Sequence, residues 1–408
     1  MKIFRFLPAL LIPLVFLAGC AKPQLQTGIW RGALKTASGN EIPFNFEITD
    51  TAGKKQMTIF NGSERFKVTD VNIKGDSVAI KMPLFDSEFK LKIEKDVLIG
   101  KWIKHLADSD AVLNFNAFHN EDWRFKTQSK PSADISGRWA TTFGAAEDTS
   151  FAVGEFKQQG AKITGTFLTT TGDYRFLEGV VSGDSLYLSA FDGGNAYLFM
   201  AKVSGDKIIG GKRYAGKSGY KEWTAVKDNN AKLPDAYSLT ALKPGFKKLA
   251  FTFNDLNGKN VSLSDERFKN KVVIVQIMGS WCPNCMDETV YMVNYYKKYQ
   301  PKGVEIVGLA YERTTDFARS QKALQHLKER FDIPYPLLIT GYTPATGEPA
   351  KSLPMLDKVL GFPTTIIIDK KGDVRKIHTG FSGPGTGEHY IEFITEFEKL
   401  TNDLLAEK

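Results

Sequence analysis

Cysteine and histidine are both scarce in this chain. Among its 408 residues there are 3 cysteines, Cys20, Cys282 and Cys285, and 5 histidines. So few cysteines exclude the disulfide framework that holds together many small secreted proteins. A structural zinc site, which takes four ligands, is also excluded at Cys282 and Cys285, because the nearest histidine is His326 and no further cysteine follows. No metal and no other cofactor are expected.

Clusters of positive charge and long apolar segments are lacking as well. The formal net charge is +8, but the excess is spread along the chain without a basic run, so no nucleic-acid partner is expected. The apolar stretch over residues 6–17 is shorter than the ~20 residues that a transmembrane helix needs, and Pro8 and Pro13 interrupt it. With 42% hydrophobic and 25% charged residues, the composition is that of a soluble globular chain with room for about two or three domains.

The N-terminus has the pattern of an export signal. Lys2 and Arg5 precede the apolar stretch, and Leu17-Ala18-Gly19-Cys20 resembles the lipobox of bacterial lipoproteins. This resemblance implies that residues 1–19 are removed as a signal peptide and that the thiol of Cys20 is acylated, so that residues 20–26 form a lipidated tether. An ordinary signal peptide with an incidental cysteine is the alternative.

Residues 27–226 carry a β pattern throughout. Apolar side chains alternate with polar ones, for example at Phe44, Phe46 and Ile48. Pairs such as Asn61-Gly62 and Gly183-Asp184 mark tight turns between these stretches. The pattern predicts an all-β region of antiparallel strands.

The β region also looks duplicated. Gly28-Ile29-Trp30-Arg31 recurs as Gly137-Arg138-Trp139-Ala140, and Glu121-Asp122-Trp123 is echoed by Lys221-Glu222-Trp223. We therefore predict two β-meander repeats, residues 27–127 and 134–228, which form either two small barrels or one larger sheet. The recurring tryptophans could be platforms for a ligand, but recurrence at equivalent points favours a shared packing role.

A change of pattern follows a linker over residues 229–243. Alternating strands and helices predict an α/β domain over residues 244–408. The near-continuous apolar run at residues 271–278 suits a strand buried on both faces. The other expected strands are residues 304–310, 337–339, 364–368 and 374–377, and the expected helices are residues 287–299, residues 315–331 and a closing helix from Glu388 onward.

The sequence Cys282-Pro283-Asn284-Cys285 lies where the buried strand gives way to a helix. The unpaired N–H groups and the dipole at a helix N-terminus stabilise a thiolate, which is the nucleophile in thiol–disulfide exchange. Cys282 is therefore expected to attack, and Cys285, one helical turn later, to resolve the mixed disulfide. Haem attachment needs a histidine after the second cysteine, and position 286 is Met286.

These residues carry a family resemblance. Trp281-Cys282-Pro283-Asn284-Cys285, followed by Glu288 and by Gly361-Phe362-Pro363-Thr364-Thr365, resembles the TlpA/ResA branch of thioredoxin-like proteins over roughly Pro244 to Leu405. The resemblance implies a thioredoxin-like fold in which Pro363 follows a cis peptide bond and faces the two cysteines. It also implies that the backbone of Phe362, together with Trp281, binds an extended substrate peptide.

Departures from thioredoxin itself concern the acidic groups. Gln276 stands where thioredoxin has a buried aspartate that helps to deprotonate the resolving cysteine. The TlpA/ResA branch also lacks that aspartate and places a glutamate three residues after the second cysteine, which here is Glu288. The resemblance therefore implies a catalytic role for Glu288. Glu312 resembles a second acidic residue of the ResA pocket, with a solvated loop carboxylate as the alternative.

The expected function is reduction of disulfides in exported proteins. The expected partners are these proteins, a membrane thiol-disulfide reductant and the membrane itself through the lipid on Cys20. The expected location is the cell envelope, anchored at the outer membrane and facing the periplasm. Two other functions stay open: a peroxiredoxin-like thiol peroxidase, and a binding lipoprotein whose β region captures a ligand.

Overall fold

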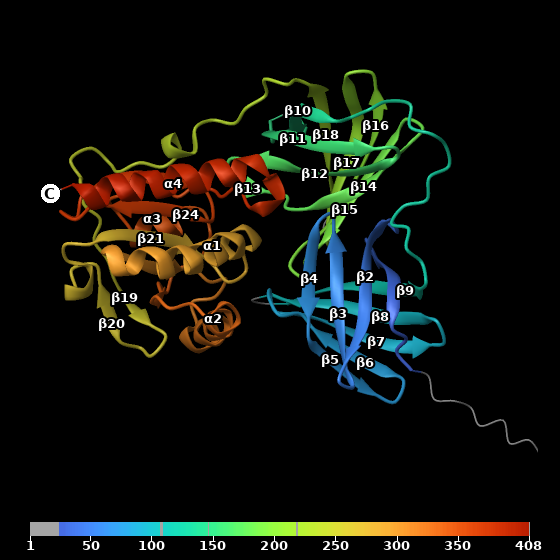
Figure 1. Ribbon diagram of the computed structural model, residues 1–408, viewed down its shortest axis with the longest axis horizontal. Helices are drawn as coiled ribbons and strands as arrows, with labels where there is room; N and C mark the ends of the chain where they lie inside the picture. The colour runs from blue at the N-terminus through green and yellow to red at the C-terminus, as the bar shows by residue number, and fades with distance from the viewer. Residues whose placement is uncertain (1–23, 107–108, 146, 218, 408) are drawn as a thin grey trace, which may run out of the picture.

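The computed structural model describes residues 24–106, 109–145, 147–217 and 219–407. The expected signal peptide and Cys20 lie outside these residues. Figure 1 shows an all-β region, built from residues of the first two repeats, beside a C-terminal α/β domain. Among the described residues, no helix combines the length and the apolar character needed to span a bilayer.

The first repeat folds into a nine-stranded antiparallel sheet with the strand order β4-β3-β2-β1-β9-β8-β7-β6-β5. Each strand pairs with the next along the chain, except that β4 and β5 do not pair and form the two edges of the sheet. The pairing of β1 with β9 joins strands β1 to β4 to strands β5 to β9. The strands are β1 Gly28–Lys35, β2 Glu41–Thr51, β3 Lys54–Asn61, β4 Glu64–Val68, β5 Asp70–Lys74, β6 Ser77–Lys81, β7 Ser87–Glu94, β8 Val97–His105 and β9 Asp110–His119.

The second repeat forms a sheet of its own, so the question of one sheet or two is answered in favour of two barrel-like sheets. Its order is β11-β10-β18-β17-β16-β15-β14-β12-β13, and an additional pairing of β11 with β12 closes the sheet into a ring. The strands are β10 Gly137–Phe143, β11 Ser150–Gln159, β12 Lys162–Thr169, β13 Gly172–Asp173, β14 Leu177–Ser182, β15 Ser185–Phe191, β16 Ala196–Ser204, β17 Lys207–Ala215 and β18 Tyr220–Lys227.

The strand register corrects one of the predicted repeat equivalences. Trp223 pairs with Phe143 in β10 and with Gly211 in β17. The residue at the corresponding point of the first sheet is Phe115. It pairs with Leu34 in β1 and with Gly100 in β8. The prediction that Trp123 corresponds to Trp223 is therefore wrong, because three similar residues were matched without regard to strand register.

The other three tryptophans that were compared between the repeats have the packing role that was expected. Trp30, Trp139 and Trp223 are 0%, 1% and 1% exposed. Trp123 instead follows β9 and is half-buried, with the guanidinium of Arg31 4.1 Å from its ring centroid. Contacts of this kind contribute only about 0.5 to 1 kcal/mol at exposed sites.

We expect Phe115→Ala to lower the free energy of unfolding of the β region by about 3 to 5 kcal/mol, since it empties a position that is 1% exposed. Trp123→Ala should cost about 1 kcal/mol, because it removes cation–π contacts at a half-buried ring. Urea unfolding of the two variants beside the wild type measures the difference. Equal losses would contradict the assignment of the core position to Phe115 and not to Trp123.

The C-terminal domain has a seven-stranded sheet with the order β20-β19-β23-β22-β21-β24-β25. Every residue of the central strand β21 is buried, as its apolar run predicts, and it pairs in parallel with β22 and antiparallel with β24. The strands are β19 Thr252–Asp255, β20 Asn260–Ser262, β21 Val272–Met278, β22 Val304–Ala310, β23 Leu337–Ile339, β24 Thr364–Ile368 and β25 Val374–Thr379.

Helices cover both faces of this sheet. Residues of α1, α2 and α4 belong to one buried hydrophobic cluster. Residues near α3 belong to a second buried cluster, together with residues of the segment that leads into β21. The helices are α1 Pro283–Tyr299, α2 Phe317–Phe331, α3 Glu348–Ser352 and α4 Glu388–Ala406, with short 3-10 turns at η1 Ala236–Ser238, η2 Glu266–Phe268, η3 Gln300–Lys302 and η4 Pro384–Thr386. The sequence did not predict β19, β20 or α3, which are too short to show a period.

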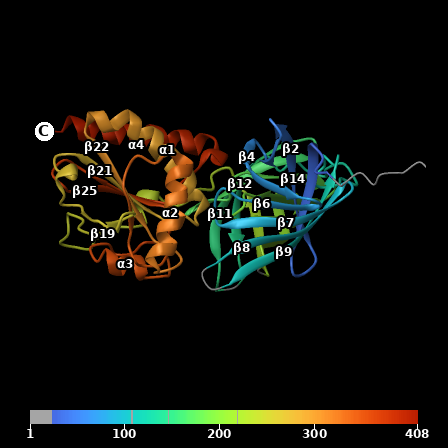
Figure 2. The ribbon, with the colours of Figure 1, turned by 90° about the horizontal axis from the view of Figure 1, so that it is seen from below.

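The N-terminal end of α1 is directed at the β region. Figure 1 shows α1 near β12 and β13 of the second sheet, and in Figure 2 it again lies towards β12. Hydrogen bonds join the two parts here, since the side-chain amide of Asn284 donates to the carbonyl oxygen of Asp173 at 3.2 Å. The fold therefore brings the β region to the same end of the domain as the two cysteines.

Candidate active site

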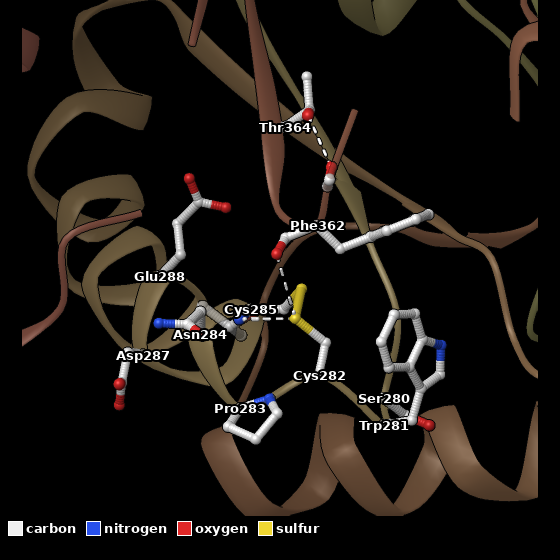
Figure 3. The surroundings of a disulfide bond; sticks show 12 residues. Ser280, Trp281, Cys282, Pro283, Asn284, Cys285, Asp287, Glu288, Phe362 and Thr364 are labelled. Carbon is white, nitrogen blue, oxygen red and sulfur yellow. Dashed lines mark hydrogen bonds between the residues drawn. A yellow bond between two sulfur atoms is a disulfide. The ribbon is translucent and has the colours of Figure 1, made fainter. Parts of the chain in front are cut away.

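The two cysteines lie at the first turn of α1. Cys282 is the N-cap residue with Pro283 next, so the helix begins four residues earlier than the predicted Asp287. The sulfur of Cys282 accepts a hydrogen bond from the backbone N–H of Cys285 at 3.2 Å. The two residues form a disulfide with their Cα atoms 5.2 Å apart, which Figure 3 shows at its centre. A backbone donor aimed at the Cys282 sulfur stabilises that atom as a thiolate when the disulfide is reduced.

The loop that leads into β24 completes the surroundings of Cys282. The peptide bond between Phe362 and Pro363 is cis, as the family resemblance implied. The carbonyl oxygen of Phe362 lies 3.6 Å from the Cys282 sulfur. The ring of Trp281 meets the ring of Phe362 edge-on with centroids 5.3 Å apart, and its indole N–H donates to the carbonyl oxygen of Tyr311 at 2.9 Å. The structure therefore brings all the predicted substrate-binding residues together at the disulfide.

Glu288 lies on α1, one turn after Cys285, and is 0% exposed. Its carboxylate accepts a hydrogen bond from the side-chain amide of Gln276 at 2.7 Å and another from the hydroxyl of Thr365 at 2.6 Å. Burial raises the pKa of Glu288 to about 7, although both hydrogen bonds act to lower it. Gln276, which stands at the position of the buried aspartate of thioredoxin, thus holds the carboxyl group of Glu288 in place. A pKa near neutrality suits proton transfer.

Glu312 is not the solvated loop carboxylate that was the alternative interpretation. It is 6% exposed, and it accepts hydrogen bonds from the backbone N–H of Ser280 at 2.8 Å and from the Ser280 hydroxyl at 2.7 Å. Burial raises the pKa of its carboxyl group. Glu312 therefore fixes the turn that leads from β21 into Trp281 and Cys282.

Sequence reasoning missed a buried charge cluster next to the cysteines. The guanidinium of Arg175, from the second sheet, donates to the carboxylate of Asp287 on α1 and to that of Glu64 in the first sheet. It also lies 3.7 Å from the carboxylate of Asp192. In Figure 3 Asp287 and Glu288 lie on the side of the disulfide opposite to Trp281. One arginine thus links all three folded units, and residues so distant in sequence show no common pattern that could have predicted it.

Arg175→Gln should destabilise the protein by about 3 to 5 kcal/mol at pH 8, because it leaves buried carboxylates without their counter-charge. Burial already raises the pKa of Asp287 to about 7, with Arg175 opposing the shift. Without the arginine the pKa of Asp287 rises further, so the loss of stability shrinks as the pH falls towards 5 and the carboxyl group of Asp287 becomes neutral. Urea unfolding at both pH values measures this.

The control for Arg175 is Arg138→Gln, which breaks a half-exposed pair with Glu155 that also connects to His389 of the C-terminal domain. Such pairs are worth about 1 kcal/mol or less. A loss of stability in Arg175→Gln that is the same at pH 5 and pH 8 would show that uncompensated carboxylates are not its cause.

A cysteine pair at the start of a helix, beside a cis-proline loop and after the buried central strand of the sheet, defines a thioredoxin-like thiol-disulfide exchange site. Comparison with known proteins agrees. Residues 230–391 match the model of the Redoxin family. The chain is 33% identical over 145 residues to thiol-disulfide oxidoreductase ResA of Bacillus thuringiensis subsp. konkukian (strain 97-27), which covers 36% of this chain and 75% of that protein.

Two further relatives are a second ResA and a solved structure. The chain is 32% identical over 144 residues to thiol-disulfide oxidoreductase ResA of Bacillus subtilis (strain 168), covering 35% of this chain and 72% of that protein. It is 23% identical to a thiol:disulfide interchange protein of the thioredoxin family from Chlorobium tepidum TLS, covering 41% of this chain and all of that one, at a TM-score of 0.31. The chain belongs to the ResA family of thiol-disulfide oxidoreductases.

Proposed function

We propose that this oxidoreductase reduces disulfides of exported proteins through Cys282 and Cys285. The observation that carries the proposal is the N-cap position of Cys282, whose sulfur faces the Cys285 N–H at 3.2 Å and the Phe362 carbonyl at 3.6 Å. The first contact favours the thiolate. The second places the backbone next to Phe362, where an extended peptide would pair, within reach of the reactive sulfur.

The proposed reaction has two exchange steps. The thiolate of Cys282 attacks one sulfur of the client disulfide, which forms a mixed disulfide and releases the other client sulfur as a thiolate. Cys285 then loses its proton and attacks the Cys282 sulfur, which forms the intramolecular disulfide and releases the second client thiolate. Two electrons pass to the client, and both client thiolates take up protons. A dithiol partner then reduces the Cys282–Cys285 disulfide by the reverse exchange.

Residues around the dithiol have separate proposed tasks. Glu288 accepts the proton of Cys285 during resolution, since the two side chains lie on one face of α1 and its pKa is raised to about 7. Trp281, Phe362 and Pro363 form the wall against which the client peptide binds. Asp287 stays paired with Arg175, so its charge does not oppose the thiolate.

The proposed location is the periplasmic side of the cell envelope, with a lipid on Cys20 as the anchor in the outer membrane and a membrane thiol-disulfide reductant as electron donor. The support is the lipobox-like Leu17-Ala18-Gly19-Cys20. Labelling of cells with a radioactive fatty acid tests the anchor. Label in the wild type that is lost in Cys20→Ala supports it, and equal label in both contradicts it.

The direction of the exchange is tested by the reduction potential of the Cys282–Cys285 pair, measured by equilibration with glutathione and with dithiothreitol. A reductase should have a potential well below the ~−120 mV of strong periplasmic oxidants, in the range of about −200 to −270 mV found for reducing thioredoxin-like proteins. A value near −120 mV would make the protein an oxidant. Rapid consumption of peroxide that does not need Cys285 would make it a peroxidase.

A further inference from the structure

The second sheet sends one hairpin onto the redox site. Strands β12 and β13 are joined by the two-residue turn Thr170-Thr171, since Thr169 pairs with Gly172. This turn packs against Gly361, the residue before Phe362. A Cβ atom added to Gly361 would lie 2.4 Å from the methyl group and 2.7 Å from the Cβ of Thr171. Thr171 therefore occupies the space directly in front of the proposed peptide-binding loop.

The same turn reaches a second loop of the C-terminal domain. A Cβ atom on Gly380 would lie 2.9 Å from the carbonyl oxygen of Thr170. Gly380 is also bonded to the peptide-binding loop, because its N–H donates to the carbonyl oxygen of Pro363 at 2.8 Å. Both loops thus touch the turn through glycine, which leaves room for the backbone of the hairpin.

The residues after the turn cover the other side of the dithiol. A Cβ atom on Gly172 would lie 2.7 Å from the side-chain carbon of Asn284, which stands between the two cysteines in sequence. Asp173 accepts a hydrogen bond from Asn284 through its backbone carbonyl at 3.2 Å and another from the Gly383 N–H through its carboxylate at 2.8 Å. The hairpin thus spans the site from the peptide-binding loop to the start of α1.

The first sheet contributes apolar side chains to the buried cluster that contains the two cysteines. Leu84, in the turn between β6 and β7, is 8% exposed and belongs to the same buried cluster as Cys282 and Cys285. Phe85 of that turn and Phe66 of β4 pack against the cluster as well. Cys282 is only 4% exposed. A polypeptide segment cannot lie along Phe362 and reach the Cys282 sulfur while the hairpin is in place.

We propose that residues 169–172 form a strap that decides which disulfides reach Cys282, with Thr171 as the residue that holds it in place. A disulfide on a polypeptide gains access only when the strap has moved off Gly361, whereas a small reagent needs a smaller opening. The strap itself contacts the C-terminal domain through the Thr171 side chain and through glycine backbones. The residues after it stay anchored, because Tyr174 packs against the core of the second sheet and Arg175 is paired with buried carboxylates. Displacement of the strap therefore leaves these contacts in place. This inference rests on the proposed function for its client class.

Alkylation of the reduced protein tests the strap without any client. Two reagents are compared: iodoacetamide, and a maleimide that carries a long polyethylene glycol chain. Thr171→Gly removes the side chain that faces Gly361, and the rate of modification of Cys282 by the large reagent should rise about tenfold over the wild type. The rise with iodoacetamide should be clearly smaller. Thr171→Ser keeps the hydroxyl and removes only the methyl group, so its rates should be intermediate.

The matched control is Ala161→Gly. It places glycine in the turn between β11 and β12, at the opposite end of β12 from the strap. Its alkylation rates should equal those of the wild type. For each protein the rate of Cys282 modification by the large reagent is divided by the rate with iodoacetamide. If this ratio is the same in Thr171→Gly, Ala161→Gly and the wild type, the strap proposal is wrong. Far-ultraviolet circular dichroism of Thr171→Gly confirms that the sheet is intact, and if it is not, Thr171→Ser decides the question.

Reduction of insulin separates this inference from the proposed function. If both hold, Thr171→Gly reduces insulin faster than the wild type by about the factor seen with the large reagent. The two reagents could modify Cys282 at the expected different rates while neither the wild type nor Thr171→Gly reduces insulin at a measurable rate. That result would support the strap and contradict the proposed function. A wild type that reduces insulin as fast as Thr171→Gly would contradict the strap alone.

Discussion

Cys285→Ala should leave the protein covalently attached to its clients through Cys282. The first exchange step still proceeds, because Cys282 and its helix N-cap environment are unchanged, but no thiol remains to attack the mixed disulfide. Turnover with a protein disulfide should fall by about 10³-fold or more, within the range found when an enzyme loses a reacting group. Mixed disulfides isolated from cells and identified by mass spectrometry would name the clients.

The control for this trap is Cys282→Ser, which removes the attacking sulfur and should yield no mixed disulfides through position 282. The double variant Cys282→Ser/Cys285→Ala should likewise be empty. Adducts of similar amount and identity in all three variants would mean that they form without Cys282. An empty Cys285→Ala trap in cells that keep the protein reduced would count against client reduction by this protein.

Glu288→Gln should slow the resolving step by about 10²-fold, the lower end of what a positioned general base contributes. Glutamine keeps the size of the side chain and can still contact Gln276 and Thr365, but it cannot take the proton of Cys285. Stopped-flow single-turnover reduction of a fluorescent disulfide separates attack from resolution. Resolution in the wild type should accelerate as the pH rises through about 7, where Glu288 becomes ionised, and this dependence should disappear in the variant.

The stability of the oxidised protein gives an independent test of Glu288, since disulfide-bonded cysteines do not titrate. A carboxyl group whose pKa is raised by burial to about 7 favours the folded state most strongly below its ordinary pKa of 4.5. That contribution is lost as the pH rises from 4.5 to 7, because the unfolded chain ionises first. Relative to the wild type, Glu288→Gln should therefore gain stability between pH 5 and pH 8.

Glu305→Gln is the matched control for both measurements. Glu305 is a buried glutamate of the same domain, 7% exposed, and its carboxylate accepts hydrogen bonds from Arg267 at 2.9 Å and Tyr296 at 3.1 Å. Its replacement should lower stability and leave the resolving step unchanged. Normal resolution kinetics in Glu288→Gln, with only a shift in stability, would reduce Glu288 to a structural role.

The parts of the site that could be predicted are those encoded by local spacing. The strand over residues 271–278, the motif at Cys282 and the glutamate one helical turn beyond Cys285 are read from a continuous stretch of chain. The backbone geometry of a helix start then fixes how they meet. The loop at Phe362 and Pro363 was placed through its resemblance to known relatives and not through its own pattern.

The parts that could not be predicted depend on contacts between folded units. Arg175 and Asp287 are single charges in unremarkable surroundings, and nothing in their spacing indicates that they meet. The same holds for Thr171, which in sequence is one of several threonines in a polar turn. Trp123 shows the opposite error. Its sequence surroundings resemble those of Trp223, but the strand register does not support an equivalence of the two residues.

The two sheets of the β region present equivalent turns to different neighbours. The turn between β3 and β4, Gly62-Ser63, has the same two-residue form as the turn Thr170-Thr171, since Asn61 pairs with Glu64. The N–H of Gly62 donates to the carboxylate of Glu178 at 2.8 Å, so this turn faces the sister sheet. The β region contains two sheets of the same kind, whereas the C-terminal domain has a single cysteine pair, so only one of the two equivalent turns lies beside it. The turn Gly62-Ser63 therefore helps to join the two sheets. The turn Thr170-Thr171 is not needed for that contact and lies beside the cysteine pair instead.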